Sequence, residues 1–279
     1  PGYVVMTELA APQGGAGNWT NGFLPAYYQG TQLRSEGSPI LDLDAPKWKN
    51  RAHQRANLDT LAALNQMHLK DHPQHEDLKA RMENFELAFR MQSAAPELID
   101  LSSETRPTQD LYGIGDGKPS DRFGKMCLMG RRMVERGVRY VQLICGGWDA
   151  HGDTQGNHTA QGRKVDQPIA GLISDLEQRG LLETTLLVWV GEFGRTPIRQ
   201  GSNGRDHHPY GFSAFMAGGG IIGGKTIGAT DDFGYNAVED VVHVRDLHAT
   251  MLHLLGIDHE RLSVQYQGLD VKLTGVEKA

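Results

Sequence analysis

Three chemically capable side chains lie within the stretch GGWDAHGD, residues 146–153. Asp149, His151 and Asp153 offer two carboxylates and an imidazole, groups that bind divalent metal ions or transfer protons. The preceding run VRYVQLIC is mostly apolar, as in a buried strand. The sequence therefore predicts a metal site or an acid–base site directly after a strand, where two glycines let the backbone turn.

A second group of polar side chains follows the apolar run TLLVWV. Its members are Glu192, Arg195, Arg205, Asp206, His207 and His208. In open α/β sheets, ligands bind beyond the carboxyl ends of the strands, so neighbouring strands would bring this group to Asp149 and His151. Two imidazoles and a carboxylate suit Zn²⁺, and a mixed site of this kind also accepts Mn²⁺. We expect such an ion to polarise a phosphoryl or sulfuryl oxygen, or to activate water.

Each of these signals also has a purely structural interpretation. An Asp-x-His pair is more often a capping or solvated pair than a pair of ligands. Glu192 ends an apolar strand, where a carboxylate is costly unless paired, and an ion pair with Arg195 satisfies it as well as a metal does. Arg195 and Arg205 suit bidentate contacts with an anionic substrate, or equally ion pairs with Glu192 and Asp206.

Composition and charge narrow the class of partner. The chain has 279 residues with a net charge of −6, and its basic residues are scattered rather than clustered. This argues against nucleic acid or an anionic membrane surface as the main partner. No apolar run approaches the roughly 18–20 residues that span a membrane. A small anionic substrate remains as the expected partner, and the oligomeric state is not predicted.

The pattern along the chain predicts one α/β domain over residues 1–279. Residues 1–50, rich in glycine, proline and aromatics, are predicted to be an irregular surface segment. Residues 51–137 are predicted to be mainly helical, with one helix ending before Pro96 and a loop over 101–121. Residues 138–279 alternate strand and helix and contain the site. This order predicts a mainly parallel, doubly wound sheet with helices on both faces.

Four motifs in linked order also resemble the domain-of-unknown-function 1501 family, over nearly the whole chain. They are GGWDAHGD, LISDLEQRGLLETTLLVWVGEFGRTP, GRDHHPYGFSAFMAGGGIIGGKTIGATDD and VRDLHATMLHLLGID. The resemblance implies an alkaline phosphatase/sulfatase-like fold with a two-part metal centre at the carboxyl edge of the sheet. Asp149 and His151 match that superfamily's strand-Asp-His motif. A later histidine ligand matches His207, with His208 as the alternative.

The sequence departs from the superfamily at two points. Glu192 stands in the place of a metal-binding aspartate, and Phe193 in the place of a second ligand that phenylalanine cannot provide. No segment before residue 50 resembles the nucleophile region, and the sulfatase signature C-x-P-x-R or S-x-P-x-R is absent. The sequence therefore resembles a carboxy-terminal portion of a longer protein. Export signals common in the family imply an extracytoplasmic location.

Two classes of function follow from the residues and the resemblance. The first is a metal-dependent hydrolase of sulfate or phosphate esters, using zinc or alternatively calcium or manganese. Its candidate metal ligands are Asp149, His151, His207, His208, Glu192 and Asp206. Its candidate catalytic residues are Glu192, Arg195 and Arg205. The second is a non-catalytic, metal-stabilised binding or assembly domain that retains the hydrolase fold. A further option, a glycan-binding role for Trp19, Trp48 or Trp148, rests on the aromatic residues alone.

Overall fold

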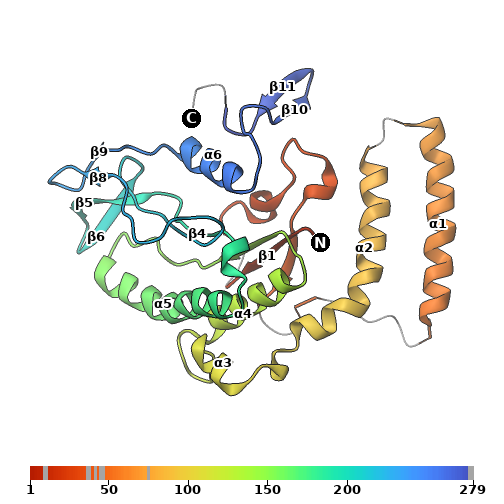
Figure 1. Ribbon diagram of the computed structural model, residues 1–279, viewed down its shortest axis with the longest axis horizontal. Coiled ribbons are helices and arrows are strands. Elements are labelled where there is room, and N and C mark those ends of the chain that lie inside the picture. The colour runs from red at the N-terminus through yellow and green to blue at the C-terminus, as the bar shows by residue number, and fades with distance from the viewer. Residues whose placement is uncertain (9–11, 36–38, 41–42, 44–47, 74–75, 276–279) are drawn as a thin grey trace. The chain divides into compact units, whose positions relative to one another are not determined.

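The structure is a computed structural model of a mixed α/β protein (Figure 1). It describes residues 1–279 apart from 9–11, 36–38, 41–42, 44–47, 74–75 and 276–279. The chain divides into two compact units, Pro1–Gly146 and Gly147–Ala279. The mixed α/β class predicted from the sequence is confirmed, and the parallel sheet has three strands.

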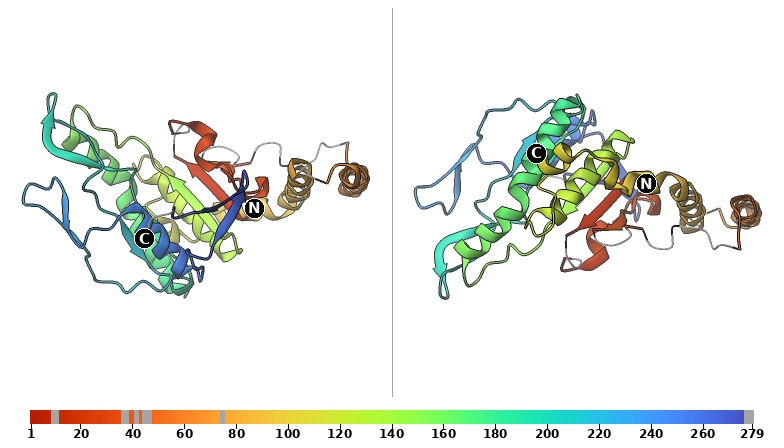
Figure 2. Two further views of the ribbon diagram at one scale, coloured as in Figure 1. Left: turned by 90° about the horizontal axis from the view of Figure 1, so that it is seen from above. Right: turned by 90° about the horizontal axis from the view of Figure 1, so that it is seen from below.

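The first unit is built on this parallel sheet, whose strand order is β2-β1-β3. β1 (Tyr3–Thr7) lies between β2 (Thr31–Arg34) and β3 (Tyr140–Ile144), and the views in Figure 2 show the strands side by side. The middle strand is well covered, with buried side chains at Val4, Val5 and Met6. The strand predicted over 138–145 is therefore present as β3.

Residues 1–50 differ from the irregular segment that their composition predicts. They provide β1 and β2, and also two short 3₁₀ helices, η1 (Gly15–Trp19) and η2 (Ala26–Tyr28). β1 is only five residues long and is followed by glycine-rich sequence. Its apolar run is therefore too short to be recognised as a strand from the sequence. Its parallel partner β3 begins at Tyr140. Pairing between strands so far apart in the sequence cannot be predicted from the residues around either strand.

Helices follow in the first unit. The α-helices in its described part are α1 (Arg51–Asp71), α2 (Glu76–Ile99), α3 (Arg106–Leu111) and α4 (Asp121–Glu135), with the 3₁₀ helix η3 (Leu101–Ser103). Asn50 caps α1, and Arg55 of α1 pairs with Glu86 of α2. α2 continues past Pro96, where we predicted an end, because one missing N–H removes one helical bond without breaking the last turn.

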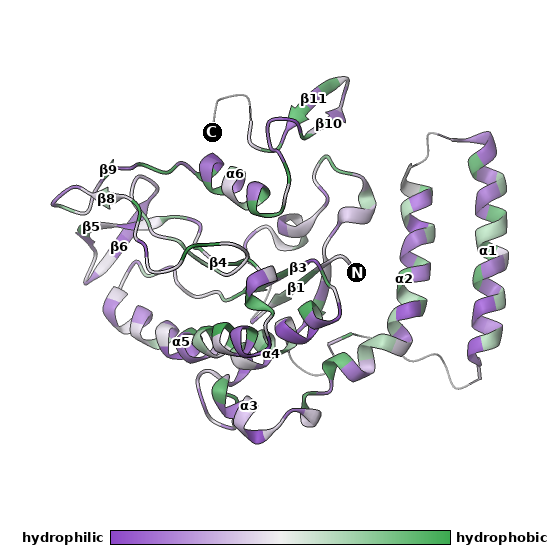
Figure 3. Ribbon diagram, viewed as in Figure 1, coloured by the Kyte–Doolittle hydropathy of each residue, from purple (hydrophilic) through white to green (hydrophobic). Residues whose placement is uncertain are grey.

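The sequence pattern of α4 explains the apolar core beside the sheet. Its buried apolar residues are Phe123, Met126, Cys127, Leu128, Met129 and Met133. Gly130 faces β3, since a β-carbon there would lie 3.6 Å from side-chain atoms of Val141 and Leu143. By contrast, α1 has no buried residue, and Figure 3 shows that much of its ribbon consists of hydrophilic residues. No helix in the described ranges combines the length and apolar character of a membrane span.

The described part of the second unit combines two α-helices with four antiparallel strand pairs. Its elements are α5 (Thr154–Gln178), η4 (Leu182–Thr184), β4 (Leu187–Trp189), β5 (Gly194–Gln200), β6 (Gly204–His208), β7 (Phe215–Ala217), β8 (Ala229–Thr230), β9 (Ala237–Glu239), α6 (Val244–Leu254), β10 (Ser263–Tyr266) and β11 (Leu269–Lys272). The pairs are β4 with β7, β5 with β6, β8 with β9, and β10 with β11. β4 and β7 were predicted as strands, but β5 and β6 lie in sequence that we predicted to be a loop.

Two glycines of α4 allow a test of its packing. A β-carbon at Gly124 would lie 2.3 Å from the backbone oxygen of Tyr112, whereas one at Gly130 meets only ordinary contacts of 3.6 Å. Gly124→Ala is expected to destabilise the protein by about 1–3 kcal/mol through overpacking. Gly130→Ala is expected to be neutral or to stabilise by up to about 1 kcal/mol, because alanine favours helix. Chemical denaturation of both variants measures this, and equal effects would contradict the described packing.

Candidate metal centre

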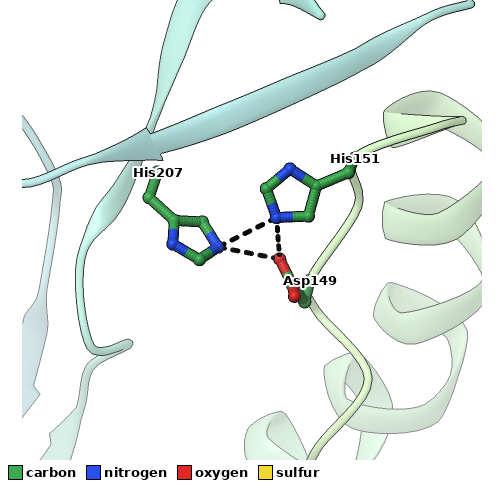
Figure 4. A group of neighbouring side chains, drawn as sticks. All are labelled: Asp149, His151 and His207. Carbon is green, nitrogen blue, oxygen red and sulfur yellow. Dashed lines mark hydrogen bonds and ion pairs between the residues drawn. The ribbon is translucent and has the colours of Figure 1, made fainter. Parts of the chain in front are cut away.

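Three predicted ligands converge in the second unit (Figure 4). Oδ1 of Asp149 lies 2.8 Å from Nε2 of His151 and 2.9 Å from Nε2 of His207. The two imidazole nitrogens are 3.0 Å apart. Among the described residues, this is the one group of three or more side chains of the metal-binding types within such reach of one another.

Backbone pairing brings the two segments together. The loop after Asp149 runs beside the start of β6, and the N–H groups of Asn203 and Arg205 donate to the carbonyls of Gly152 and Ala150 at 2.8 and 3.1 Å. The N–H of Thr154 donates in return to the carbonyl of Asn203 at 3.2 Å. His151 is thereby held opposite the strand that carries His207, so the convergence is fixed by the backbone rather than by the side chains alone.

Gly204 is required for this close approach. A β-carbon at this position would lie 1.9 Å from the carbonyl oxygen of His151 and 2.7 Å from the nitrogen of Gly152. Both contacts are with backbone, which cannot move aside without displacing the loop. The glycine at the start of β6 therefore sets the distance between the loop and the hairpin.

The second acidic residue of the motif GGWDAHGD has a structural role. Asp153 is the N-cap of α5, and its side chain accepts a hydrogen bond of 3.0 Å from the N–H of Gly156. Capping of this kind satisfies an N–H group that the helix leaves without a partner. α5 begins at Thr154, three residues after His151. The start of the helix thus fixes the end of the loop that carries Asp149 and His151.

Asp149 is the electrostatic centre of the group. Besides His207, Arg195 donates to its Oδ1 from Nη2 at 2.9 Å. The hydrogen bonds from His207 and Arg195 lower the pKa of Asp149 to about 2, with a further contribution from the charge of His151. The carboxylate therefore stays ionised, as a metal ligand must be, far below neutral pH.

Two neighbours that are not metal ligands contact the imidazoles. The side-chain oxygen of Gln200, the last residue of β5, lies 2.6 Å from Nδ1 of His151. The ring of Phe193 packs on the ring of His207 with centroids 4.4 Å apart. One imidazole is therefore held by a hydrogen bond at its second nitrogen, and the other by ring packing. The pattern of residue types gave no indication of either contact.

The donor set fits a divalent transition metal. Zn²⁺ takes histidine nitrogen and carboxylate oxygen at about 2.0–2.2 Å in tetrahedral geometry, which places ligand atoms about 3.3 Å apart. The three atoms here are 2.8–3.0 Å apart, so each pair needs to open by only a few tenths of an ångström. Side chains of Asp149, His151 and His207 are 60%, 41% and 45% exposed. Three protein ligands facing solvent leave room for a further ligand, as in catalytic zinc sites.

The structure places the other predicted site residues around this group or away from it. Oδ1 of Asp206 is 3.9 Å from Nδ1 of His151 and accepts a hydrogen bond from the N–H of His207. His208 is 2% exposed, and its Nε2 donates to the carbonyl of Tyr235. Successive side chains of a strand point to opposite faces, which separates His208 from His207.

Two further candidates lie outside the three-residue group. Arg205 donates from Nη1 to the carbonyl of Gly204 at 2.8 Å. Glu192 lies between β4 and β5. It is not a member of the group formed by Asp149, His151 and His207. Arg195, which the sequence pairs equally well with Glu192 or a substrate, pairs with Asp149.

The chain belongs to the family described as "Protein of unknown function (DUF1501)", whose model matches residues 1–279. The membership expected from the linked motifs is thereby confirmed. Comparison with curated proteins and with solved structures gives no match. The family description names no activity, so the function of the chain is inferred from the site itself.

Gly204→Ala tests the backbone approach without altering a ligand. The added methyl group is expected to push the loop at His151 away from β6 and to weaken zinc binding about tenfold or more, with helix content retained. Gly152→Ala is the matched control, since a β-carbon there meets nothing within 4 Å. Competition with a chromophoric chelator measures both affinities. Equal zinc affinity in the two variants would show that the close contact does not set the site.

Acid titration of the metal-free protein tests the contacts of Asp149. Followed by carboxyl-carbon NMR, its pKa is expected at about 2. Because this folded-state pKa is lowered, the stabilisation is complete above about pH 4 and is lost as the pH falls towards about 2. Arg195→Gln should raise the pKa, since it removes a cationic donor. Arg199→Gln is the control, because Arg199 donates to Ser202, and an unchanged pKa in Arg195→Gln would contradict the contact.

Proposed function

We propose that this chain is a metal-dependent hydrolase of sulfate or phosphate esters. The supporting observation is that Asp149, His151 and His207 place three ligand atoms within 3.0 Å of one another. These residues would hold a divalent ion, with zinc the best match to two nitrogens and one oxygen and manganese or calcium as alternatives. When bound, the ion would supply Lewis-acid polarisation of an ester oxygen.

Cationic side chains beside the ligands support an anionic substrate. Arg195 lies against Asp149, and Arg205 stands two residues before His207 on the same strand. In a chain with a net charge of −6, guanidinium groups at the site provide a local attraction for a sulfate or phosphate group. Glu192, on the turn from β4 to β5, is the proposed proton-transfer group. His208 is outside the proposed ligand set because it is bonded to Tyr235.

The proposal includes an alkaline phosphatase/sulfatase-like arrangement of the sheet. It is supported by β3, a parallel strand that ends at Ile144 and is followed by the ligand loop that begins with Asp149. Ligands in open α/β sheets bind beyond the carboxyl ends of such strands. The described residues contain this one parallel sheet of three strands, so the complete doubly wound sheet remains part of the proposal.

A second candidate is a non-catalytic, metal-stabilised binding or assembly domain. One observation favours it: Arg195 donates to the same Oδ1 of Asp149 that faces both imidazoles. A guanidinium at this oxygen neutralises the carboxylate and shares the atom that a catalytic ion would need. In this alternative the ion would stabilise the loop and the β5–β6 hairpin without turnover.

Metal content and turnover together separate the candidates. We expect close to one zinc ion per chain by elemental mass spectrometry, loss of that ion in the double variant His151→Ala/His207→Ala, and hydrolysis of p-nitrophenyl sulfate or phosphate that depends on it. The control is His248→Ala, because His248 is an exposed histidine on α6.

The outcomes of this experiment differ for each candidate. A bound ion that is lost in the double variant, without turnover of either ester, favours the non-catalytic domain and contradicts the hydrolase. No bound ion after incubation with zinc, manganese and calcium in turn would contradict both. Equal loss of metal in His248→Ala would show that the ion is not held by the proposed ligands.

A further inference from the structure

We propose that Gln200 is a positioning residue that fixes the tautomer of His151 and thereby makes the three-residue group able to bind a metal ion. The inference rests on the proposed metal site but is independent of ester hydrolysis. It begins from the contact between the side-chain oxygen of Gln200 and Nδ1 of His151, which are 2.6 Å apart.

The direction of this hydrogen bond follows from chemistry. An amide oxygen only accepts hydrogen bonds, so Nδ1 of His151 is the donor. A neutral imidazole has one N–H group, and a proton on Nδ1 leaves a lone pair on Nε2. Gln200 therefore selects the tautomer in which Nε2 can donate its electron pair to a metal.

The atoms opposite Nε2 show why the selection matters. Nε2 faces Oδ1 of Asp149 at 2.8 Å and Nε2 of His207 at 3.0 Å. A carboxylate oxygen has no hydrogen to offer, so the lone pair of His151 and the charge of Asp149 repel each other in the absence of a cation. In this tautomer His151 and Asp149 both present electron pairs to a cation, and His207 would join them on giving up the Nε2 proton that it donates to Asp149.

The opposite tautomer would close the site. With its proton on Nε2, His151 would donate to the carboxylate of Asp149, as His207 does at 2.9 Å. A hydrogen bond to a carboxylate is charge-assisted and stronger than one to a neutral amide. Oδ1 of Asp149 already accepts from His207 and Arg195, however, so a third donor gains less at that oxygen. The acceptor that Gln200 offers at Nδ1 then decides the tautomer of His151.

The hairpin places Gln200 so that it can perform this role. Gln200 ends β5 and pairs across the hairpin with Gly204, the residue packed against the backbone of His151. One hairpin thus holds both the backbone and the ring of the ligand. Asp206, whose Oδ1 is 3.9 Å from Nδ1, lies beyond hydrogen-bond distance and accepts from the N–H of His207 instead. Metal-bound histidines commonly donate their second nitrogen to such an outer acceptor.

Two substitutions separate the acceptor from the shape of the side chain. Gln200→Met keeps the length and removes the acceptor, whereas Gln200→Glu keeps an acceptor. Gln155→Met, at an exposed position in the first turn of α5, is the control for loss of a glutamine elsewhere. Zinc affinity is expected to fall about 10–100-fold in Gln200→Met and to be retained in Gln200→Glu and Gln155→Met.

The tautomer itself is read directly by ring-nitrogen NMR of the metal-free protein at about pH 8.5, where a free imidazole is neutral. We expect the His151 proton on Nδ1 in the unsubstituted protein and in Gln200→Glu, and on Nε2 in Gln200→Met. A role in folding alone would not move this signal. A proton on Nε2 in the unsubstituted protein, or full zinc affinity in Gln200→Met, would overturn the inference.

The same measurements distinguish this inference from the proposed hydrolase. Zinc binding that depends on Gln200, together with no ester turnover, supports the positioning role and contradicts the hydrolase. Absence of zinc binding in the unsubstituted protein overturns the metal site and with it the role of Gln200. Turnover that survives in Gln200→Met at full zinc affinity overturns the inference and leaves the hydrolase in place.

Discussion

The site depends on a short stretch of backbone pairing between the loop of residues 150–154 and residues 203–205. Three hydrogen bonds join segments that are far apart in the sequence, and the absence of a side chain at Gly204 permits their distance. The approach of Asp149 and His151 to His207 follows from this alignment. The two histidines face each other because their backbones are already in register, and Asp149 completes the group from the start of the same loop.

The members of the candidate group could be predicted from the sequence, and the family resemblance favoured His207 over His208, but the residue types alone could not decide between these two histidines. Asp149 and His151 stand directly after an apolar strand, and His207 lies in a polar stretch before the next one, which is enough to indicate a site. Whether His207 or His208 faces it depends on the phase of β6. That phase is set by pairing with β5. The Asn203-Gly204 dipeptide indicates a turn, but its flanks lack the alternating apolar residues that predict paired strands. The contact of Gln200 with His151 likewise depends on the hairpin and could not be predicted without it.

The fold shows the same division between local and distant causes. α4, α5 and α6 follow from apolar residues at helical spacing, and β3 from its apolar run, because these signals are local. β1 and β2 were not predicted, because they are stabilised by pairing with strands far away in the sequence. The antiparallel pairing of β4 with β7 could not be read from either strand alone, because an apolar run does not specify the direction of its partner.

The separation of the ligands along the chain has a consequence for unfolding. Asp149 and His207 are 58 residues apart, so an ion bound by both would act as a reversible cross-link that closes a long loop. In the chain-entropy view, a covalent link over such a loop reduces the freedom of the unfolded chain by an amount worth about 4 kcal/mol. The resistance of the second unit to proteases would then rise with the concentration of free metal, and a chelator would make that unit unfold before the first one.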